Sequence, residues 1–456
     1  MITLDNELSA LDVGDKRLTK RSIQVLEALG STPQESIPAA CGGWRETKAA
    51  YRLFDNEKIT AQAVLEPHYQ CTMERMKAHP VVLCVQDTSE LDYTGKNDIQ
   101  GLGPLNYERR QGLHIHPTLA VTPDKLCLGI LDSWNWSREK GSLAERKDST
   151  RPIEEKESVR WLEGYQRVCE QQRSLPETQL IYSGDREGDI YEIFQEHDRQ
   201  VEQGKAADWL IRGRHDRLLH NGKHLLATVE ETASLGQIEF DLPPGRQRQS
   251  RRVTQDLYSC QATLKGVYRK GGRLQNVDVT VILAREENPP NGEKAIEWFL
   301  LTNQEIKGFE AVAKRIQWYL CRWQIEIFFK ILKSGCKIEK LQLETMARLE
   351  PALSFYMIIA WRVLYLTMLG RTCPDIPCDV VFEAEEWQAV YTVSHRQPPP
   401  EKPPGLNEMI RMVATYGGFL NRKSDGEPGV QTLWIGLQRV RDFTLAIEVQ
   451  KSIMAS

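Results

Sequence analysis

The run Val81-Val82-Leu83-Cys84-Val85, followed by Gln86-Asp87, decides how the middle of this chain folds. Such a continuous apolar run, rich in β-branched residues, is typical of a strand that is buried on both faces of its sheet. A second short apolar run, Gln179-Leu180-Ile181-Tyr182, ends in the same way at Gly184-Asp185. Sites in α/β sheets form where strands end, because the strand ends are fixed and the loops open to solvent. The sequence therefore places Asp87 and Asp185 at positions suited to a site.

Alternating strands and helices are predicted around these two runs. Stretches 114–121 and 126–131, separated by the turn 122–125, predict two strands, and 209–212 predicts another. Helical patterns cover 153–173 and about 188–197. The order β-β-β-α-β-α-β indicates an α/β domain.

The segments on either side of this region are mainly helical, apart from one β-rich stretch. Predicted helices cover 16–29, 44–55, 60–76 (with Thr60 as its cap), 308–347, 351–370 and, after a proline-rich linker at 398–404, a helical tail over about 405–452. Residues 213–305 predict strands between turns that contain Gly and Pro, which indicates a β-rich insertion. We expect a helical domain over 1–70, an α/β domain with the insertion over 71–370, and a helical domain over 371–456.

Charge is placed unevenly along the chain. The net charge of −4 and the pI near 6.2 do not by themselves indicate a nucleic-acid binder. Residues 205–275, however, contain more basic than acidic residues, in three clusters: Arg212, Arg214 and Arg217; Arg246, Arg248, Arg251 and Arg252; Arg269, Lys270 and Arg273. For any one cluster a solvated basic face is the simpler interpretation, but three together favour a polyanionic partner.

Several classes of protein are excluded by composition. We find no apolar stretch of the ~18 residues that a membrane span needs, and the first seven residues do not resemble a signal peptide. The ten cysteines show neither a CxxC pair nor a zinc-ligand spacing. We expect reduced thiols in a cytoplasmic protein.

Residues 316–337 predict a helix with one narrow polar stripe. On a helical wheel its polar residues fall within an arc of about 80°: Tyr319, Arg322, Glu326, Lys330, Lys333 and Lys337. Most residues outside the arc are apolar, so the helix is expected to be packed on most of its circumference. One acid among cations suits a carboxylate-bound metal ion flanked by phosphates. Salt pairing of Arg322, Glu326 and Lys330 on an exposed edge is the alternative interpretation.

The same residues carry a resemblance to a known family. Tyr319, Arg322, Glu326 and Lys333 have two, three and six residues between them, and Trp323, Ile325 and Lys330 belong to the same pattern. In these residues the chain resembles the bacterial cut-and-paste transposases of the insertion-sequence family that includes the transposase of transposon five.

Further segments resemble this family in the same order. They are Ala50-Tyr51-Arg52-Leu53-Phe54, Asp87 to Tyr93, Gly184 to Tyr191, Arg212 to Arg217, Glu297 to Thr302 and Tyr416 to Phe419. The likeness is weakest towards the C-terminus. The linker at 398–404 also departs from the pattern, since it is rich in proline where more basic residues would be expected.

The resemblance implies a fold and a chemistry. The fold would be an RNase H-like catalytic core, a mixed five-stranded sheet with helices, flanked by helical N- and C-terminal domains. Asp87, Asp185 and Glu326 would hold two Mg²⁺ ions, which Mn²⁺ could replace, for phosphodiester cleavage and strand transfer. Asp87 would contact both ions. For a single aspartate at a strand end, a turn cap is the alternative interpretation.

DNA contacts are implied for a second set of residues. Arg322, Lys330, Lys333 and Tyr319 would bind phosphates near the cut, and Trp298 would stack on a flipped base while a hairpin forms. Trp298 and Trp323 could equally be core residues. Arg212, Arg214, His215 and Arg217 resemble a basic loop that touches DNA, and Arg17, Arg21 and Arg52 are candidates for reading the end sequence.

The implied partners are double-stranded DNA, as transposon ends and as target, and a second copy of the chain in a synaptic homodimer. No membrane is expected. A nuclease of the RNase H type that cuts without joining remains an alternative, as does a non-catalytic DNA-binding relative. The N-terminal helices and the β-rich segment argue against the former, and the three carboxylates argue against the latter.

Overall fold

A computed structural model describes residues 4–96, 99–139, 141, 150–242 and 250–455. The chain divides into two compact units. The first comprises Met1–Met76, Thr88–Leu143 and Gln324–Ser456, and the second comprises Lys77–Asp87 and Ala144–Trp323. Helices and strands occur in both, which confirms a mixed α/β class with helical regions at both ends of the chain.

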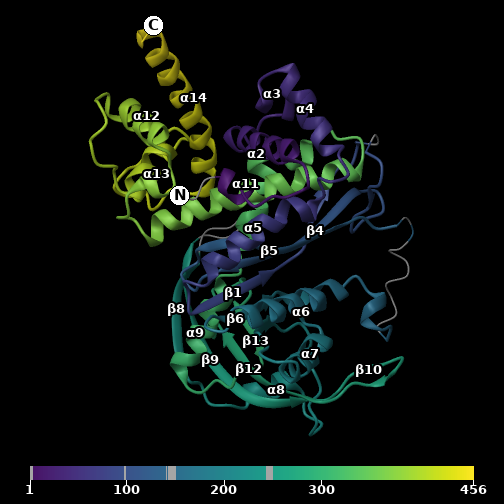
Figure 1. Ribbon diagram of the computed structural model, residues 1–456. Coiled ribbons are helices and arrows are strands. Elements are labelled where there is room, and N and C mark those ends of the chain that lie inside the picture. Colours follow the sequence, from purple (N-terminus) through teal and green to yellow (C-terminus); the bar gives the residue numbers. More distant parts are fainter. Residues whose placement is uncertain (1–3, 97–98, 140, 142–149, 243–249, 456) are drawn as a thin grey trace. The chain divides into compact units, whose positions relative to one another are not determined.

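The second unit is built on a mixed sheet (Figure 1). Its strands follow one another in the order β1 (Val81–Gln86), β6 (Gln179–Gly184), β7 (Asp208–Arg212), β13 (Glu297–Thr302), β12 (Val277–Arg285), β9 (Arg251–Leu264) and β8 (Gly236–Leu242). The pairs β1–β6 and β6–β7 are parallel, and the remaining pairs are antiparallel. Because β13 pairs with β7, the predicted β-rich insertion continues the same sheet. A separate hairpin joins β10 (Tyr268–Arg269) to β11 (Gly272–Arg273).

The central strands are buried as their apolar sequences predict. Every residue of β1 except Val81 is buried, and the same holds for β6 except Gln179. Helix α6 (Val159–Ser174) packs on both strands and on α7 (Tyr191–Glu202), while α9 (Phe309–Leu320) packs on β7 and β9. Helix α8 (Leu225–Glu230) packs on β9. These elements confirm the strands and helices expected between 81 and 212.

Four strands of the first unit form antiparallel pairs. Strand β4 (Gln111–Val121) pairs with β2 (Ser89–Asp92), β3 (Gly103–Pro104) and β5 (Cys127–Trp136). The sequence predicted β4 and β5 but not β2, because Ser89-Glu90-Leu91-Asp92 is short and mostly polar. Its strand conformation depends on the pairing with β4, which is a tertiary contact.

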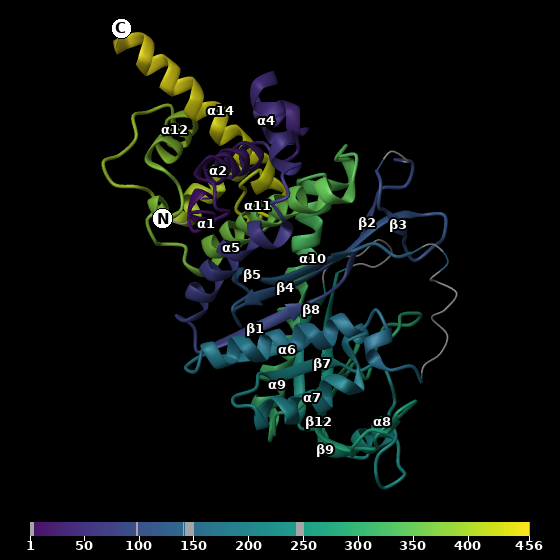
Figure 2. The same ribbon diagram turned by 45° about the vertical axis from the view of Figure 1, so that its right-hand side comes forward.

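Helices make up the rest of the first unit (Figure 2). They are α1 (Leu4–Glu7), α2 (Lys16–Ser31), α3 (Ile37–Cys41), α4 (Trp44–Phe54), α5 (Ala61–Met76), α10 (Trp323–Lys330), α11 (Met346–Thr372), α12 (Ala384–His395), α13 (Leu406–Thr415) and α14 (Val430–Ala455). The Thr60 hydroxyl accepts a hydrogen bond from the Ala63 amide, as expected of the cap of α5. Helices α1, α3 and α12 were not predicted.

Helix α11 is the central helix of this unit. Contrary to the expectation from the sequence, it is long and apolar enough to cross a membrane by length and composition. Its most apolar window is 94% buried within the protein, however, and the helix packs on α2, α5, β5 and α13. The apolar surface of α11 is therefore covered by this unit, as in the core helix of a globular domain.

The single helix predicted over 308–347 is wrong. The chain forms α9, then a tight turn in which the Cys321 and Arg322 amides bond to carbonyls three residues back, and then α10. From Ile331 the helix widens into a π-turn, closed by a hydrogen bond of 2.7 Å from the Cys336 amide to the Ile331 carbonyl. Regular α-helical rotation, which the prediction of one narrow polar stripe over 316–337 requires, is therefore interrupted at 321–322 and again from Ile331.

Close packing explains where this helical segment ends. A Cβ atom at Gly335 would lie 3.1 Å from the ring of Trp434 in α14, so a larger residue would press against that ring. Lys337 then adopts a left-handed conformation with φ of 49°, which breaks the helix. The apolar residues of the segment are nonetheless buried as predicted, among them Ile325 and Phe328.

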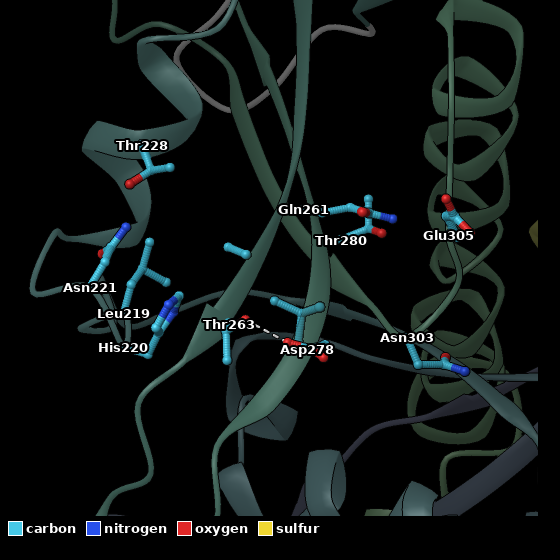
Figure 3. Close-up of a pocket in the computed structure, with 12 residues that line it drawn as sticks. Leu219, His220, Asn221, Thr228, Gln261, Thr263, Asp278, Thr280, Asn303 and Glu305 are labelled. Atoms are coloured by element: carbon cyan, nitrogen blue, oxygen red, sulfur yellow. Dashed lines mark hydrogen bonds between the residues drawn. The ribbon is translucent and has the colours of Figure 1, made fainter.

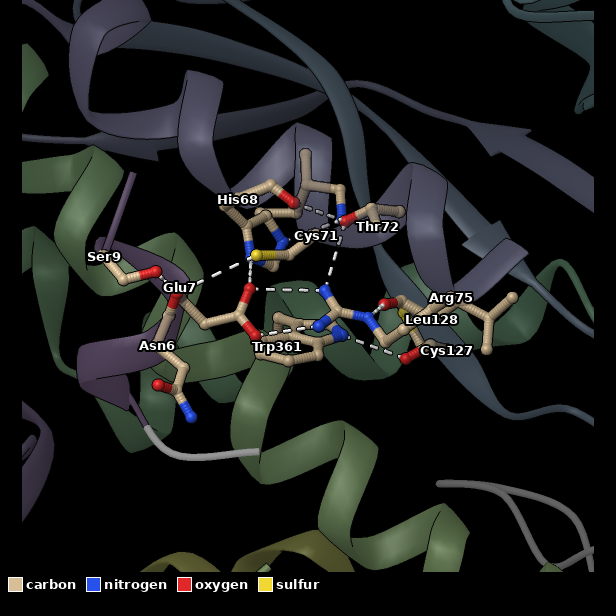
Figure 4. Close-up of polar contacts among 11 residues, drawn as sticks. Asn6, Glu7, Ser9, His68, Cys71, Thr72, Arg75, Cys127, Leu128 and Trp361 are labelled. Carbon is tan, nitrogen blue, oxygen red and sulfur yellow. Dashed lines mark hydrogen bonds and ion pairs between the residues drawn. The ribbon is translucent and has the colours of Figure 1, made fainter. Parts of the chain in front are cut away.

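A buried polar network fastens helix α1 to the core of the first unit (Figure 4). The Glu7 carboxylate bonds to His68 Nδ1 at 2.5 Å and to Arg75 Nη1 at 2.8 Å. His68 Nε2 accepts the Ile130 amide at 3.0 Å, so the neutral ring donates from Nδ1 to Glu7. The Arg75 guanidinium lies 4.4 Å from the centre of the Trp361 ring. The network thus joins α1, α5, β5 and α11.

The pKa shifts in this network give it a pH dependence. Burial alone would raise the pKa of Glu7, but the charges and hydrogen bonds of His68 and Arg75 outweigh it and lower that pKa. Burial also lowers the pKa of His68, against the attraction of Glu7. Both groups have lower pKa values in the folded than in the unfolded state. Their contribution to stability is therefore present above the unfolded pKa values and is lost as the pH falls.

We predict that Glu7→Ala lowers the free energy of unfolding by about 3–5 kcal/mol, because it leaves Arg75 as a buried cation without its carboxylate. Chemical denaturation at neutral pH measures this, and Glu57→Ala, at an exposed carboxylate, serves as the control. The difference between wild type and Glu7→Ala should shrink as the pH falls. A difference that is the same at every pH would show that the network does not titrate.

Candidate functional site

Two carboxylates of the second unit follow neighbouring parallel strands. Strands β1 and β6 pair in register from Val81 opposite Gln179 to Val85 opposite Ser183. Asp87 and Asp185 each come two residues after the last of these pairs, so they occupy equivalent positions beyond the two strand ends. Adjacent strands lie about 4.8 Å apart, so the two aspartates stand side by side at one edge of the sheet.

Each aspartate has a defined partner. Asp87 accepts a hydrogen bond of 2.9 Å from Arg322, which follows α9, and the two side chains are only 16% and 11% exposed. Asp185 accepts the Glu187 amide at 2.7 Å and so caps the turn after β6. The turn-cap interpretation thus accounts for one oxygen of Asp185. It does not account for Asp87, which forms an ion pair between residues distant in sequence.

Tyr319 brings the end of α9 to the same group of residues. Its side chain is 4% exposed, and its hydroxyl is buried without a hydrogen bond to any described residue. Burial raises the pKa of Tyr319, the positive charges of Arg322 and Arg212 oppose that shift, and the Asp185 carboxylate adds to it. Two cations, Arg212 and Arg322, and the Asp185 carboxylate therefore lie near Tyr319, and they come from three separate segments of this unit.

The basic loop after β7 is held by Asp189, whose role the sequence did not reveal. The Asp189 carboxylate accepts the backbone amides of Arg214 and His215 at 2.7 and 2.9 Å and pairs with Arg217 at 2.5 Å. Asp189 is the second aspartate in the segment Gly184 to Tyr191, which is the signal that could have identified it. Arg214 and His215 are exposed, whereas Arg217 is 11% exposed and serves as a buried anchor. Burial lowers the pKa of His215, against the attraction of Asp189.

Of the four arginines in the other two basic clusters that the structure describes, three pair with carboxylates. Arg251 pairs with Glu286 and Glu293, Arg252 with Glu239, and Arg269 with Glu192. Arg246 and Arg248 lie outside the described residues. Arg212 donates to the Glu297 carbonyl at 3.1 Å. The excess of basic residues over 205–275 is therefore used largely to join strands and loops.

Trp298 and Trp323 differ in their surroundings. Trp298, in β13, is half-buried and stacks on Phe240 of β8, with ring centres 5.1 Å apart and planes inclined by 26°. Trp298 is therefore neither fully buried in the core nor fully exposed. Trp323 is 56% exposed and lies beside the Arg322 guanidinium, so its interpretation as a core residue is wrong.

The remaining residues predicted for the site on the segment 316–337 belong to the first unit. Glu326 is half-buried in α10 and Lys330 is exposed at its end. Burial lowers the pKa of Lys333, while the carboxylates of Glu339, Glu90 and Asp92 act in the opposite direction. Lys333 therefore faces acidic groups of its own unit. Among the N-terminal arginines, Arg17 and Arg52 are exposed and Arg21 is half-buried; these lie in α2 and α4.

The donors present fit a hard divalent cation only in part. Asp87 and Asp185 supply carboxylate oxygens, which Mg²⁺ prefers, at adjacent positions of one sheet edge. Over the ranges that the structure describes, no three carboxylate, histidine or cysteine side chains are grouped so that they could hold a metal ion. Asp87 and Asp185 thus follow neighbouring strands of the second unit, and Glu326 belongs to the first unit.

The second unit also contains a polar cavity of about 450 Å³ (Figure 3). It is lined by residues of β9 and β12 and of the loops beside them, including His220, Thr263, Asp278 and Glu305. Thr263 donates to Asp278 at 2.6 Å. Because its lining includes two carboxylates and no lysine or arginine, this cavity does not suit a polyanion.

Two family models match the chain. Residues 3–59 match the model described as transposase DNA-binding, and residues 358–454 match the model described as the transposase Tn5 dimerisation domain. Both segments lie in the first unit, and both agree with the resemblance that the motifs indicated.

We predict that Asp189→Ala destabilises the second unit by about 3–5 kcal/mol, because Arg217 would remain buried without its carboxylate. Hydrogen exchange at the Arg214 and His215 amides should also become faster. Asp198→Ala, at an exposed position of α7, is the matched control. Unchanged exchange at both amides would show that Asp189 does not hold the loop.

Proposed function

Because this chain belongs to the Tn5-like transposases, whose DNA-binding and dimerisation domains it shares, we propose that it is a DDE transposase acting through Asp87, Asp185 and Glu326. It would bind the ends of a transposable element as a synaptic homodimer, cut them, and join them to target DNA. Its catalytic core would be of the RNase H type, acting in the bacterial cytoplasm.

The observation that carries this proposal is the position of Asp87 and Asp185. They follow two parallel strands in register, within the same unit as Arg322 and Tyr319. Carboxylates at adjacent strand ends supply hard ligands, and a cationic and a phenolic group beside them suit a phosphodiester. The segment carrying Glu326 follows Arg322 directly in the sequence, and the resemblance assigns it the third carboxylate.

Two divalent ions held by these carboxylates would supply Lewis acidity and a more acidic bound water. The chain's own residues would place the DNA. Arg322 is held 2.9 Å from Asp87, so its guanidinium can orient a phosphate oxygen beside that carboxylate. The buried Tyr319 hydroxyl can donate to a neighbouring phosphate. Lys330 and Lys333 would contribute positive charge as point cations.

The route to the second strand is proposed to be a DNA hairpin. A 3′ hydroxyl that attacks the opposite strand bends the DNA so tightly that a terminal base must leave the stack. Trp298 is half-buried and already stacked on Phe240, which holds its ring in a fixed plane. A base could then stack on that aromatic pair, which would stabilise the bend by ~1–3 kcal/mol.

We predict that Asp87→Asn, Asp185→Asn and Glu326→Gln each abolish cleavage of a duplex carrying the element's end but leave its binding intact. These substitutions remove a negative ligand charge while they keep the side-chain shape. Cleavage of labelled DNA is followed on a denaturing gel in Mg²⁺, in Mn²⁺ and in chelator, and binding by gel shift.

Glu310→Gln, at an exposed position in the first turn of α9, is the control and should cut like wild type. Folding of each variant is checked by its melting temperature. Full cleavage in chelator would refute the metal-dependent mechanism. Loss of DNA binding in all three variants, with folding intact, would refute their role as metal ligands.

We predict that Trp298→Ala leaves the first nick near the wild-type rate and slows hairpin formation roughly tenfold or more, as the loss of one base stack implies. Trp298→Phe keeps an aromatic face and should recover most of the rate. Nick, hairpin and double-strand break separate by length on the same gel.

An equal slowing of nicking and hairpin formation by Trp298→Ala would assign Trp298 to the fold instead. If the wild-type protein makes nicks and never joins strands, the chain is a nuclease and the transposase proposal fails.

A further inference from the structure

A second cavity, of about 330 Å³, lies within the first unit. One wall comes from the N-terminal segment, with Gln34, Ser36 and Tyr51, and the other from Cys336 to Gln342, with Lys337 and Lys340. The first wall falls in the segment that matches the transposase DNA-binding model. The second wall follows the π-turn that ends the helical segment of Glu326. The cavity is therefore where the end-binding region meets the polypeptide that continues from the catalytic helix.

The two lysines of this cavity differ from the arginines of the basic clusters. Neither Lys337 nor Lys340 forms an ion pair or a side-chain hydrogen bond with any residue that the structure describes. The cavity's one carboxylate, Glu35, is exposed and bonds to neither lysine. Gln34, Ser36, Tyr51 and Gln342 add hydrogen-bonding groups to the lining, and Ile37, Pro38, Cys336 and Leu341 add apolar surface. Two lysines that no carboxylate binds, beside neutral hydrogen-bonding groups, suit an anion.

The backbone at Lys337 supports the same conclusion. Its φ of 49° lies in the left-handed region, where glycine is favoured and a lysine is strained. The backbone conformation of Lys337 therefore does not stabilise the fold more than a glycine would. Its side chain lines the cavity, where its ammonium group could bind an anionic ligand.

We propose that this cavity holds a backbone phosphate of the DNA end, with Lys337 and Lys340 as its cations. The inference rests on the DNA binding of the proposed function and deepens it. One phosphate held between the N-terminal helices and the segment that follows the catalytic helix would fix how far the recognised sequence lies from the cut. The ligand is a phosphodiester because a lysine pair with neutral donors recognises charge and oxygen, not a base edge.

The first experiment labels lysines of the wild-type protein with an acylating reagent, with and without a duplex copied from the DNA that flanks the gene. Mass spectrometry gives the extent of labelling at each lysine. Lys337 and Lys340 should be protected several-fold by the duplex. Lys125 is the internal control, since it is exposed in the turn between β4 and β5 and also has a left-handed φ, of 70°. Its labelling should not change.

The second experiment compares Lys337→Gln, Lys340→Gln and the control Lys125→Gln by the salt dependence of DNA binding. Each lost phosphate contact should reduce the slope of log K against log salt concentration by about 0.9. Lys125→Gln should leave the slope unchanged. Lys337→Gly separates the effect of the lost charge from the effect of the backbone conformation. It should bind DNA as weakly as Lys337→Gln, and its melting temperature should be equal or higher because glycine favours a left-handed φ.

The possible outcomes separate the two levels of the proposal. If the wild-type protein binds no DNA, the proposed function itself fails. If the wild-type protein binds but labelling and salt slope are unchanged at Lys337 and Lys340, the phosphate site alone is overturned. Protection by inorganic phosphate without DNA, to the same extent as by the duplex, would assign the cavity to a free anion and also overturn the DNA contact.

Discussion

The parallel register of β1 and β6 is the constraint on which the candidate site depends. It places Asp87 and Asp185 at equivalent positions on neighbouring strands, so two negative charges stand together beside buried apolar strands. Such charges repel one another, and a compact fold tolerates them only with cations nearby. Within the second unit Arg322 supplies one, through its bond to Asp87. The same demand for positive charge makes the pair a candidate site for a hard divalent cation.

The distribution of ion pairs separates structural cations from those available to a ligand. Arg217, Arg251 and Arg269 are each bound to a carboxylate and hold loops or strands in place. An excess of basic residues in the sequence therefore includes residues that serve the fold. Lys337 and Lys340 stand outside the three basic clusters of residues 205–275, and they line a cavity without a carboxylate partner among the described residues. A basic residue without a carboxylate partner is a better indicator of a polyanion site than the number of basic residues in a segment.

The first unit shows how segments far apart in sequence are joined. Helix α11 forms its core, and the bonds of Glu7 to His68 and Arg75 fasten the first helix beside it. The segments that match the transposase DNA-binding and dimerisation models thus belong to one compact unit.

The sequence by itself determined the order of elements and the chemistry of the site residues. Apolar runs predicted β1 and β6, helical periodicity predicted α2, α4, α5 and α6, and spaced motifs identified the family, because these signals are local in the chain. Only the tertiary structure decided the turn at Cys321, the π-turn before Gly335, the pairing of β2 and the burial of Arg217 by Asp189. Each depends on a partner distant in sequence or on departures from regular helical rotation, and neither is recorded in a periodic pattern. For the same reason the sequence could single out Asp87, Asp185 and Arg322 as candidate site residues, while only the packed sheet and the turn after α9 bring Arg322 onto Asp87.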